Sequence, residues 1–151
     1  MNRQVQDSGH KMNLNQEMTD TQRRILLSVM WIFVLLNVVY ADILRMLRPG
    51  YLESLKQSSQ ELSDTSLLLF AVLMEIAISM VLLSQLLNYQ AIRWTHFIAV
   101  PLTILGVIAP LLMPTFGDGT PLFYIFFASL EVVMMLVIIW YVWKWFKPQS
   151  R

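Results

Sequence analysis

The chain has 151 residues, of which 56% are hydrophobic and only 14% are charged. Because a soluble domain of this size carries about a quarter charged residues, the composition excludes an ordinary soluble protein and predicts a chain that folds in a lipid bilayer. The net charge of +1, with no run of basic residues, excludes a nucleic-acid-binding protein. Cysteine is absent, which excludes disulfides, thiol redox chemistry and iron–sulfur clusters.

The chain begins with a polar segment, residues 1–22, that is rich in Asn and Gln and shows no apolar periodicity. This composition predicts a disordered cytoplasmic tail. The first apolar run starts at Ile25, is long, and has no small-residue cleavage site after it. We therefore expect a retained membrane span rather than a secretory signal.

Four apolar runs follow, at about residues 25–45, 66–87, 92–113 and 121–146. Each is close to the roughly 20 residues that an α-helix needs to cross a bilayer. Only Asn88 to Gln90 separate the second run from the third, and helices joined by so short a turn pack antiparallel. The sequence therefore predicts an all-α integral membrane four-helix bundle of up-down topology over residues 23–147, followed by a short tail at 148–151.

The third run contains Pro101, Gly106 and Pro110. Proline inside a helix removes a backbone hydrogen bond and bends the axis, and membrane spans tolerate it because neighbouring groups satisfy the carbonyls that are released. We expect a proline-kinked third helix with space beside it.

Basic residues are distributed unevenly between the two ends of this bundle. Three lie at one end, namely Arg45, Arg48 and Lys56. The remaining eight lie on the side of the two termini: Arg3, Lys11, Arg23, Arg24, Arg93, Lys144, Lys147 and Arg151. The positive-inside rule then predicts an inner (plasma) membrane protein with both termini in the cytoplasm. Tryptophans typical of a membrane anchor lie at the same level: Trp94, Trp140, Trp143 and Trp145.

Two acidic residues, Glu75 and Glu131, stand alone inside apolar runs. A charged side chain there costs roughly 2.5 kcal/mol or more, so an acid at this depth favours a functional site. Glu75 lies nine residues after Ser66 and Glu131 lies ten after Pro121, where their runs begin. At 1.5 Å per residue both are about 14 Å deep, near the bilayer midplane. We expect the two carboxyls to face a common pocket.

Two adjacent carboxyls do not both ionise cheaply, so one is expected to hold a proton near neutral pH. Such a pair can relay protons, bind a cation, or supply an acid and a base to a lipid-soluble substrate. The alternative is that each acid is a hydrogen-bonded polar residue that only fixes helix register.

The first run carries a second polar group, formed by Asn37, Tyr40 and Asp42. Asn37 and Tyr40 are three residues apart and are expected to share a face, with Asn37 directed toward Glu131 or Tyr124. Asp42 is expected to pair with Arg45 at the membrane interface. The predicted pocket comprises Glu75, Glu131, Asn37, Tyr40, Ser79 and Tyr124.

The chain has no recognisable catalytic or cofactor-binding motif. There is no Gly-rich phosphate loop and no Ser-His-Asp set, and His10 and His96 are far apart. We therefore predict no metal, no cofactor and no catalytic residue. His96 is expected to be an interfacial residue with its hydrogen bonds satisfied, and Arg93 is expected to reach the lipid headgroups.

Several short motifs resemble a known family. Met74-Glu75, the segment Met80 to Ser84, and Arg93-Trp94 resemble the second hairpin of small bacterial four-helix membrane proteins of unknown function. The pattern of the first helix is similar as well: Trp31-Ile32-Phe33, then Asn37, Tyr40, Ala41, Asp42 and Ile43. The likeness spans residues 26–99 and implies the four-helix architecture without an activity. In size and topology the chain is also similar to DoxX-like proteins and to sterol-isomerase-type four-helix domains.

Three functions compete at this point. The favoured one is a non-enzymatic bundle that binds a small lipophilic or cationic ligand, or passes protons, through a pocket containing Glu75 and Glu131. The second is an accessory or structural subunit whose acids fix packing or meet a membrane partner or a second copy. The third is an intramembrane enzyme that uses one carboxyl as acid and the other as base on a lipid-like substrate.

Overall fold

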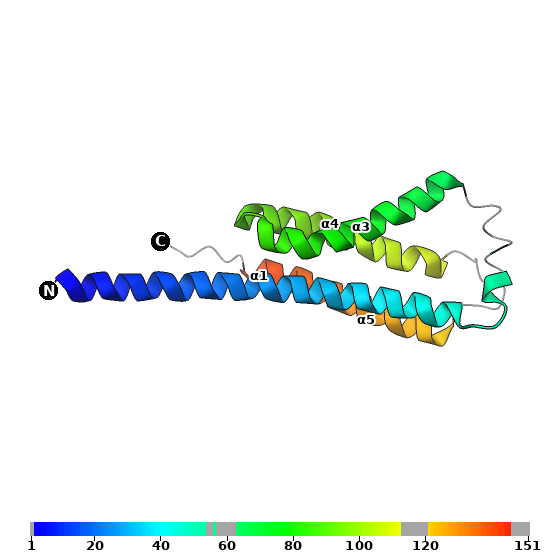
Figure 1. The fold of residues 1–151 in the computed structure, drawn as a ribbon, viewed down its shortest axis with the longest axis horizontal. Helices are drawn as coiled ribbons and strands as arrows, with labels where there is room; N and C mark the ends of the chain where they lie inside the picture. Colours follow the sequence, from blue (N-terminus) through cyan, green and yellow to red (C-terminus); the bar gives the residue numbers. More distant parts are fainter. Residues whose placement is uncertain (1, 54–55, 57–62, 113–120, 146–151) are drawn as a thin grey trace.

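The computed structural model describes residues 2–53, 56, 63–112 and 121–145, and their long elements are all helices (Figure 1). The helices are α1 (Asn2–Met46), α3 (Asp64–Leu86), α4 (Tyr89–Leu112) and α5 (Leu122–Trp145). The all-α prediction is confirmed. The short C-terminal tail predicted at residues 148–151 lies outside the described residues.

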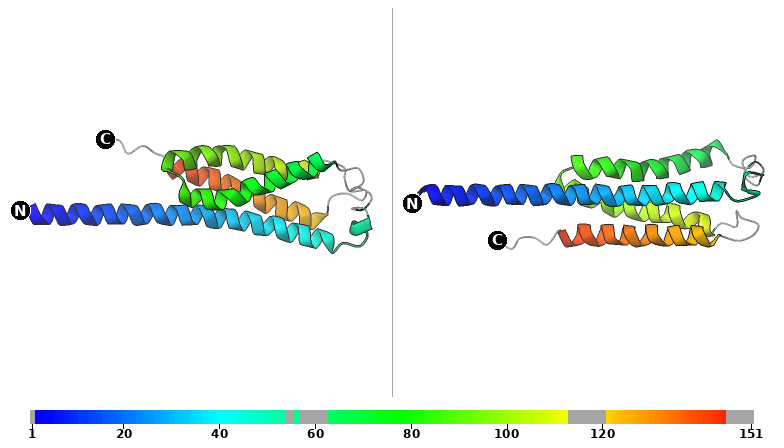
Figure 2. Two further views of the ribbon diagram at one scale, coloured as in Figure 1. Left: turned by 45° about the horizontal axis from the view of Figure 1, so that its top comes forward. Right: turned by 60° about the horizontal axis from the view of Figure 1, so that its bottom comes forward.

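The four helices form a ring in which each packs against two others. α1 and α4 each lie beside α3 and α5, whereas the backbones of α3 and α5 do not approach one another, and neither do those of α1 and α4. Successive helices run in opposite directions, and the start of α1 and the end of α5 lie at one end of the bundle (Figures 1 and 2). We call this the termini end; the turn after α1 lies at the opposite end.

Each of the four helices contains a segment long and apolar enough to cross a membrane. These segments are Thr19–Met46, Leu67–Leu86, Tyr89–Ala109 and Leu122–Lys144. Many of their large apolar side chains lie on the outside, where a membrane protein meets lipid tails that are as apolar as its own core. The helices therefore indicate a small multi-pass membrane protein.

Each helix buries a single narrow stripe of side chains. In α5 the buried residues follow one another in steps of three and four: Ala128, Glu131, Met135, Ile138 and Val142. In α4 they are Ile92, His96, Ala99, Val100, Thr103 and Val107, and in α3 they are Ala77, Met80 and Ser84. Such steps keep one side of a helix turned to its neighbours at a small crossing angle. A residue's angular position on the helix thus decides whether it lies inside.

α3 packs against the bundle mainly over its second half. Every residue from Leu67 to Val72 is exposed, and six consecutive residues cover the whole circumference of a helix. Burial begins only around Leu73, which is half-buried, and Ala77, which is buried. The first half of α3 therefore has no core-facing side, and in Figure 1 it diverges from the other helices toward the opposite end.

The N-terminal segment differs from the expected disordered tail, because α1 is helical from Asn2 onward and extends beyond the other helices (Figure 2). The segment contains no proline and is continuous with an apolar span. Extending an existing helix avoids the cost of nucleating a new one, which favours helix even for a polar sequence. In α4 the helix is continuous through Pro101 and Pro110, and the kink there stays a prediction.

Side chains of α1 hold the end of α3 at the termini end. The Arg24 guanidinium donates hydrogen bonds to the carbonyls of Gln85 and Leu87, at 3.1 and 2.6 Å. The last carbonyls of a helix have no partner within the helix and carry partial negative charge, so a cation there is favourable. Ser28 donates to the Val81 carbonyl at 2.9 Å, and the Gln85 amide donates to the Ser28 hydroxyl at 2.8 Å.

Arg24→Gln is expected to lower the free energy of unfolding by about 1.5–3 kcal/mol, because it removes charged hydrogen bonds to carbonyls that then lack a partner. Unfolding in detergent micelles with added dodecyl sulfate, followed by circular dichroism, measures this loss. Arg24→Lys keeps the charge and is expected to lose less. Wild-type stability in Arg24→Gln would contradict a role for this contact in holding α3.

Candidate functional site

The structure does not bring Glu75 and Glu131 together. The Glu131 side chain is only 3% exposed and lies in the buried stripe of α5, whereas Glu75 is exposed on α3. The helices that carry them face each other across the ring without backbone approach. The two acids match in depth, but Glu75 is two residues before the buried Ala77. Two residues correspond to about 200° around the helix, so Glu75 lies on the side of α3 opposite to Ala77. The pocket expected between these two glutamates is therefore not formed.

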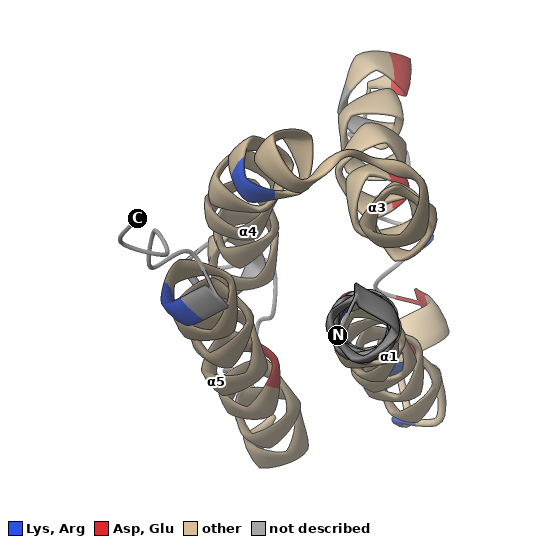
Figure 3. Ribbon diagram, turned by 90° about the vertical axis from the view of Figure 1, so that its left-hand side faces the viewer, with Lys and Arg blue, Asp and Glu red and all other residues tan. Residues whose placement is uncertain are grey.

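A different acid is the neighbour of Glu131. Asp42 of α1 is half-buried and lies within electrostatic reach of the Glu131 carboxyl. In Figure 3 the red segment of α5 lies on the side of the helix that faces α1. The two carboxyls that act on one another in this bundle are thus contributed by the adjacent helices α1 and α5.

Arg45 is the cation of this group. Its guanidinium carbon lies 4.9 Å from the centre of the Tyr124 ring and 5.4 Å from the centre of the Tyr51 ring. It also lies within electrostatic reach of Asp42, the acid with which a pair was predicted. The Arg45 guanidinium therefore lies near the Asp42 carboxyl of its own helix and near the Tyr124 ring of α5.

The turn after α1 brings Tyr51 to this site. Gly50 has a φ of 78°, a left-handed conformation that favours glycine because it has no Cβ. The Tyr51 amide donates to the Arg48 carbonyl at 3.2 Å, which closes the turn. The chain thereby folds back over Arg45. The sequence analysis did not predict that the Tyr51 ring lies over Arg45.

The Arg45 cluster, defined as Asp42, Arg45, Tyr51, Tyr124 and Glu131, contains two carboxyls and one guanidinium. Asp42, Arg45 and Glu131 each lie within electrostatic reach of the Tyr124 phenol, and Asp42 also lies within reach of Arg45 and of Glu131. With both acids ionised the cluster would carry one negative charge more than positive. Net charge in a low-dielectric interior is costly. The arrangement is therefore suited to accept one further positive charge.

The remaining pocket candidates lie in different surroundings. Asn37 is buried, and its amide donates to the Phe33 carbonyl of its own helix at 2.7 Å. Tyr124 of α5 lies beside Arg45 of α1. Glu131 is seven residues further into the bundle on α5, and Asn37 is about as far into the bundle on α1. Glu131 therefore lies near the level of Asn37. Tyr40 is 58% exposed, because it lies about 60° further around α1 than Asn37 and beyond the edge of the buried stripe. Ser79 is half-buried on α3.

His96 lies in the core rather than at the interface where it was expected. Its side chain is fully buried, and Nδ1 donates to the Ile92 carbonyl at 2.7 Å. Nε2 lies 3.4 Å from the Ser84 hydroxyl of α3, which is 2.6 Å from the Met80 carbonyl. The Trp31 ring of α1 packs 6.1 Å away. His96 thus contacts side chains of α1 and α3 from its place on α4. Its spacing from the other buried residues of α4 could have predicted that it lies in the core.

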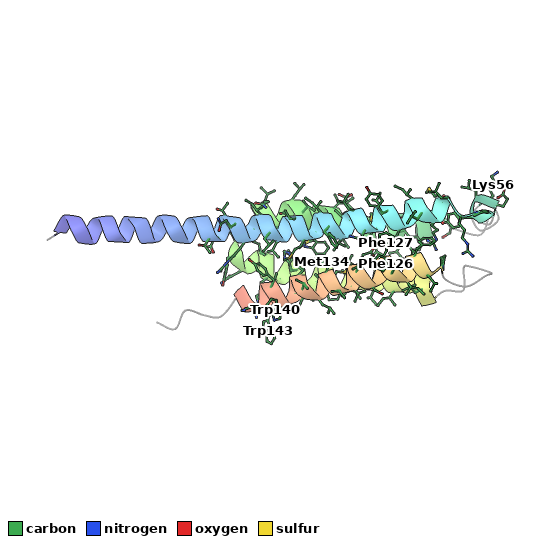
Figure 4. The ribbon with its side chains drawn as sticks, turned by 90° about the horizontal axis from the view of Figure 1, so that it is seen from below. Lys56, Phe126, Phe127, Met134, Trp140 and Trp143 are labelled. Carbon is green, nitrogen blue, oxygen red and sulfur yellow. The ribbon has the colours of Figure 1, made fainter. Side chains whose placement is uncertain are left out.

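The predicted anchor residues lie at the termini end. Trp94, Trp140 and Trp143 are exposed, and Figure 4 shows Trp140 and Trp143 near that end of α5. The side chain of Trp145 lies outside the described part of the chain. Arg93 lies over the Phe97 ring at 5.9 Å, and Lys144 lies over the Trp140 ring at 5.0 Å.

The described residues contain no group of three His, Asp or Glu side chains that could hold a metal ion. The groups that the Arg45 cluster itself offers are two carboxyls, one guanidinium and two phenol rings.

Comparison with known proteins gives a family but no activity. No curated protein and no solved structure matches the chain. Residues 15–150 match a family of unknown function, DUF6326, and this range includes the Arg45 cluster and all four membrane-spanning segments. The resemblance to an uncharacterised family is thus confirmed, while the likeness to DoxX-like proteins stays a prediction. The chain belongs to the DUF6326 family.

Proposed function

We propose that this protein crosses the membrane as an up-down bundle and binds a proton or a small lipophilic cation at the Arg45 cluster. The observation that carries this proposal is the position of Glu131: 3% exposed, in the middle of a span, and within electrostatic reach of Asp42. The carboxyl pair deduced from depth, Glu75 with Glu131, is replaced by Asp42 with Glu131.

Charge balance favours a cation as the ligand. Arg45 compensates one carboxyl, so the second is compensated when a proton or a monovalent organic cation binds. Tyr51 and Tyr124 already lie beside the Arg45 charge at cation–π distance, and aromatic faces of this kind also attract organic cations. The cluster includes the turn after α1, so a ligand would enter from the opposite end of the bundle.

Tetraphenylphosphonium is a suitable probe, since it is lipophilic and carries a single positive charge. We expect the purified protein in detergent to bind it, and to bind it more weakly at pH 6 than at pH 8 because a proton competes for the same negative charge. Glu131→Gln should weaken binding by at least about 30-fold, the equivalent of about 2 kcal/mol for a lost buried charge partner. Isothermal titration calorimetry measures both effects.

Glu75→Gln is the matched control, because it makes the same substitution on an exposed side chain of a helix outside the cluster. Its affinity for tetraphenylphosphonium and its pH dependence should equal those of the wild type. The proposal is overturned if Glu131→Gln binds the cation as the wild type does, or if the two variants lose affinity equally.

A second function, that of an accessory subunit, is favoured by Glu75 itself. This carboxyl is exposed within a membrane-spanning segment, next to the half of α3 that has no core-facing side. A membrane partner or a second copy that covered it would remove an acid from lipid. In that case Glu75→Gln, and not Glu131→Gln, would release a stoichiometric partner from the protein isolated in mild detergent.

For the orientation we propose an inner-membrane protein with both termini in the cytoplasm, on the basis of the uneven basic residues. The natural absence of cysteine allows single-cysteine variants to be labelled without further changes. In intact bacterial cells a membrane-impermeant thiol reagent is expected to label Ser63→Cys, and to label Asn88→Cys only after lysis. Labelling in the reverse order would invert the orientation.

A further inference from the structure

The termini end of the α4–α5 pair carries two basic residues outside the Arg45 cluster. Arg93 lies four residues after the start of α4, and Lys144 is next to the last residue of α5. The two helices pack against each other and run in opposite directions, so both cations lie at the same end of adjacent helices. Figure 3, which looks onto this end, shows the blue segments of both helices.

The same arrangement occurs on both helices. Each cation lies over an aromatic ring that is one turn deeper in the membrane-spanning segment: Arg93 over Phe97 at 5.9 Å and Lys144 over Trp140 at 5.0 Å. A phospholipid has the matching order of groups, with the phosphate at the interface and the acyl chains one layer deeper. Cations and rings thus follow the order in which a lipid presents its phosphate and its chains.

An exposed tryptophan is the chain neighbour of each cation. Trp94 is 68% exposed and Trp143 is 66% exposed, and Figure 4 shows Trp143 directed away from the bundle. Indole rings favour the headgroup level because they have an apolar body and one polar N–H. This surface therefore lies where headgroups lie, which makes a lipid a better fit than a soluble phosphate compound.

Acidic residues are remote from this surface on both helices. α4 contains no Asp or Glu, and the single acid of α5, Glu131, lies 13 residues from Lys144. That separation is about 20 Å along the helix, beyond the Debye length of about 8 Å at physiological salt. At the termini end, α4 and α5 therefore contribute positive charge through Arg93 and Lys144, and positive charge favours an anion.

We propose that Arg93 and Lys144, with Trp94, Trp140 and Trp143, bind the phosphate of an anionic phospholipid in the leaflet at the termini end. This α4–α5 lipid site is separate from the Arg45 cluster and does not depend on the function proposed for it. Both cations interact with the phosphate, and the rings interact with the glycerol and acyl region. A zwitterionic lipid, whose headgroup carries its own cation, is bound more weakly.

Thermal unfolding of the full chain in dodecylmaltoside micelles tests this proposal. Phosphatidylglycerol is expected to raise the Tm in a saturable manner, whereas phosphatidylcholine and inorganic phosphate at equal concentration are not. The variant Arg93→Gln/Lys144→Gln should bind phosphatidylglycerol about 30-fold more weakly, since each basic residue near the membrane surface contributes about 1 kcal/mol. Wild-type affinity in this variant would overturn the proposal.

The control Arg48→Gln/Lys56→Gln removes the same charge from the opposite end. Equal loss of affinity in the control would mean that net charge rather than a site attracts the lipid, and would overturn the proposal. A Tm shift with inorganic phosphate as large as that with phosphatidylglycerol would assign the surface to a soluble phosphate compound instead. Glu131→Gln is expected to retain lipid binding, which distinguishes failure here from failure of the cation-binding function.

A measurement on the wild-type protein covers the case in which the double variant does not fold. In phosphatidylcholine vesicles, phosphatidylglycerol with brominated acyl chains is expected to quench tryptophan fluorescence more strongly than brominated phosphatidylcholine at the same mole fraction. Trp94, Trp140 and Trp143 are exposed and should contribute to this difference, whereas Trp31 is fully buried and should contribute little. Equal quenching by the two lipids would overturn the proposal.

Discussion

Each helix of this bundle buries one narrow stripe and turns the rest of its circumference outward, and the other features of the molecule depend on that constraint. In a lipid bilayer an apolar side chain is favourable both on the lipid-facing side of a helix and on its buried side. Apolar residues therefore do not show which side of a helix faces inward. Polar side chains do distinguish the two sides, because a polar side chain in a buried stripe needs a partner within the bundle. Glu131 on α5 and His96 on α4 lie on such stripes, and Glu75 does not.

Two groups of polar residues in the interior differ in their chemistry. At the termini end, Ser28, Ser84 and His96 use backbone carbonyls or one another as partners, and their hydrogen bonds join α1, α3 and α4. In the Arg45 cluster the groups interact through charge and aromatic faces instead. The first group therefore accounts for packing, and the second is the group to which cation binding is assigned in the proposed function.

α3 packs against the bundle mainly over its second half, and its Glu75 side chain is exposed. Its second half is fixed by Arg24 and Ser28 of α1, whereas its first half is exposed all round. α1, α4 and α5 provide the Arg45 cluster and the α4–α5 lipid site without it. The exposed first half of α3 is thus available for contacts with lipid or another chain.

The amino-acid sequence by itself determined the four spans, their approximate bounds and the depth of each polar residue, because length and hydropathy set how far a helix extends and 1.5 Å per residue sets depth. It also placed Asp42 beside Arg45, three residues apart on one helix. The tertiary structure decided which side of each helix faces inward. Glu75 and Glu131 match in depth, yet α3 turns Glu75 outward and α5 turns Glu131 inward toward Asp42. A span that is apolar on all sides does not show which side will face inward, because the same apolar side chains are favourable in lipid and in the protein interior.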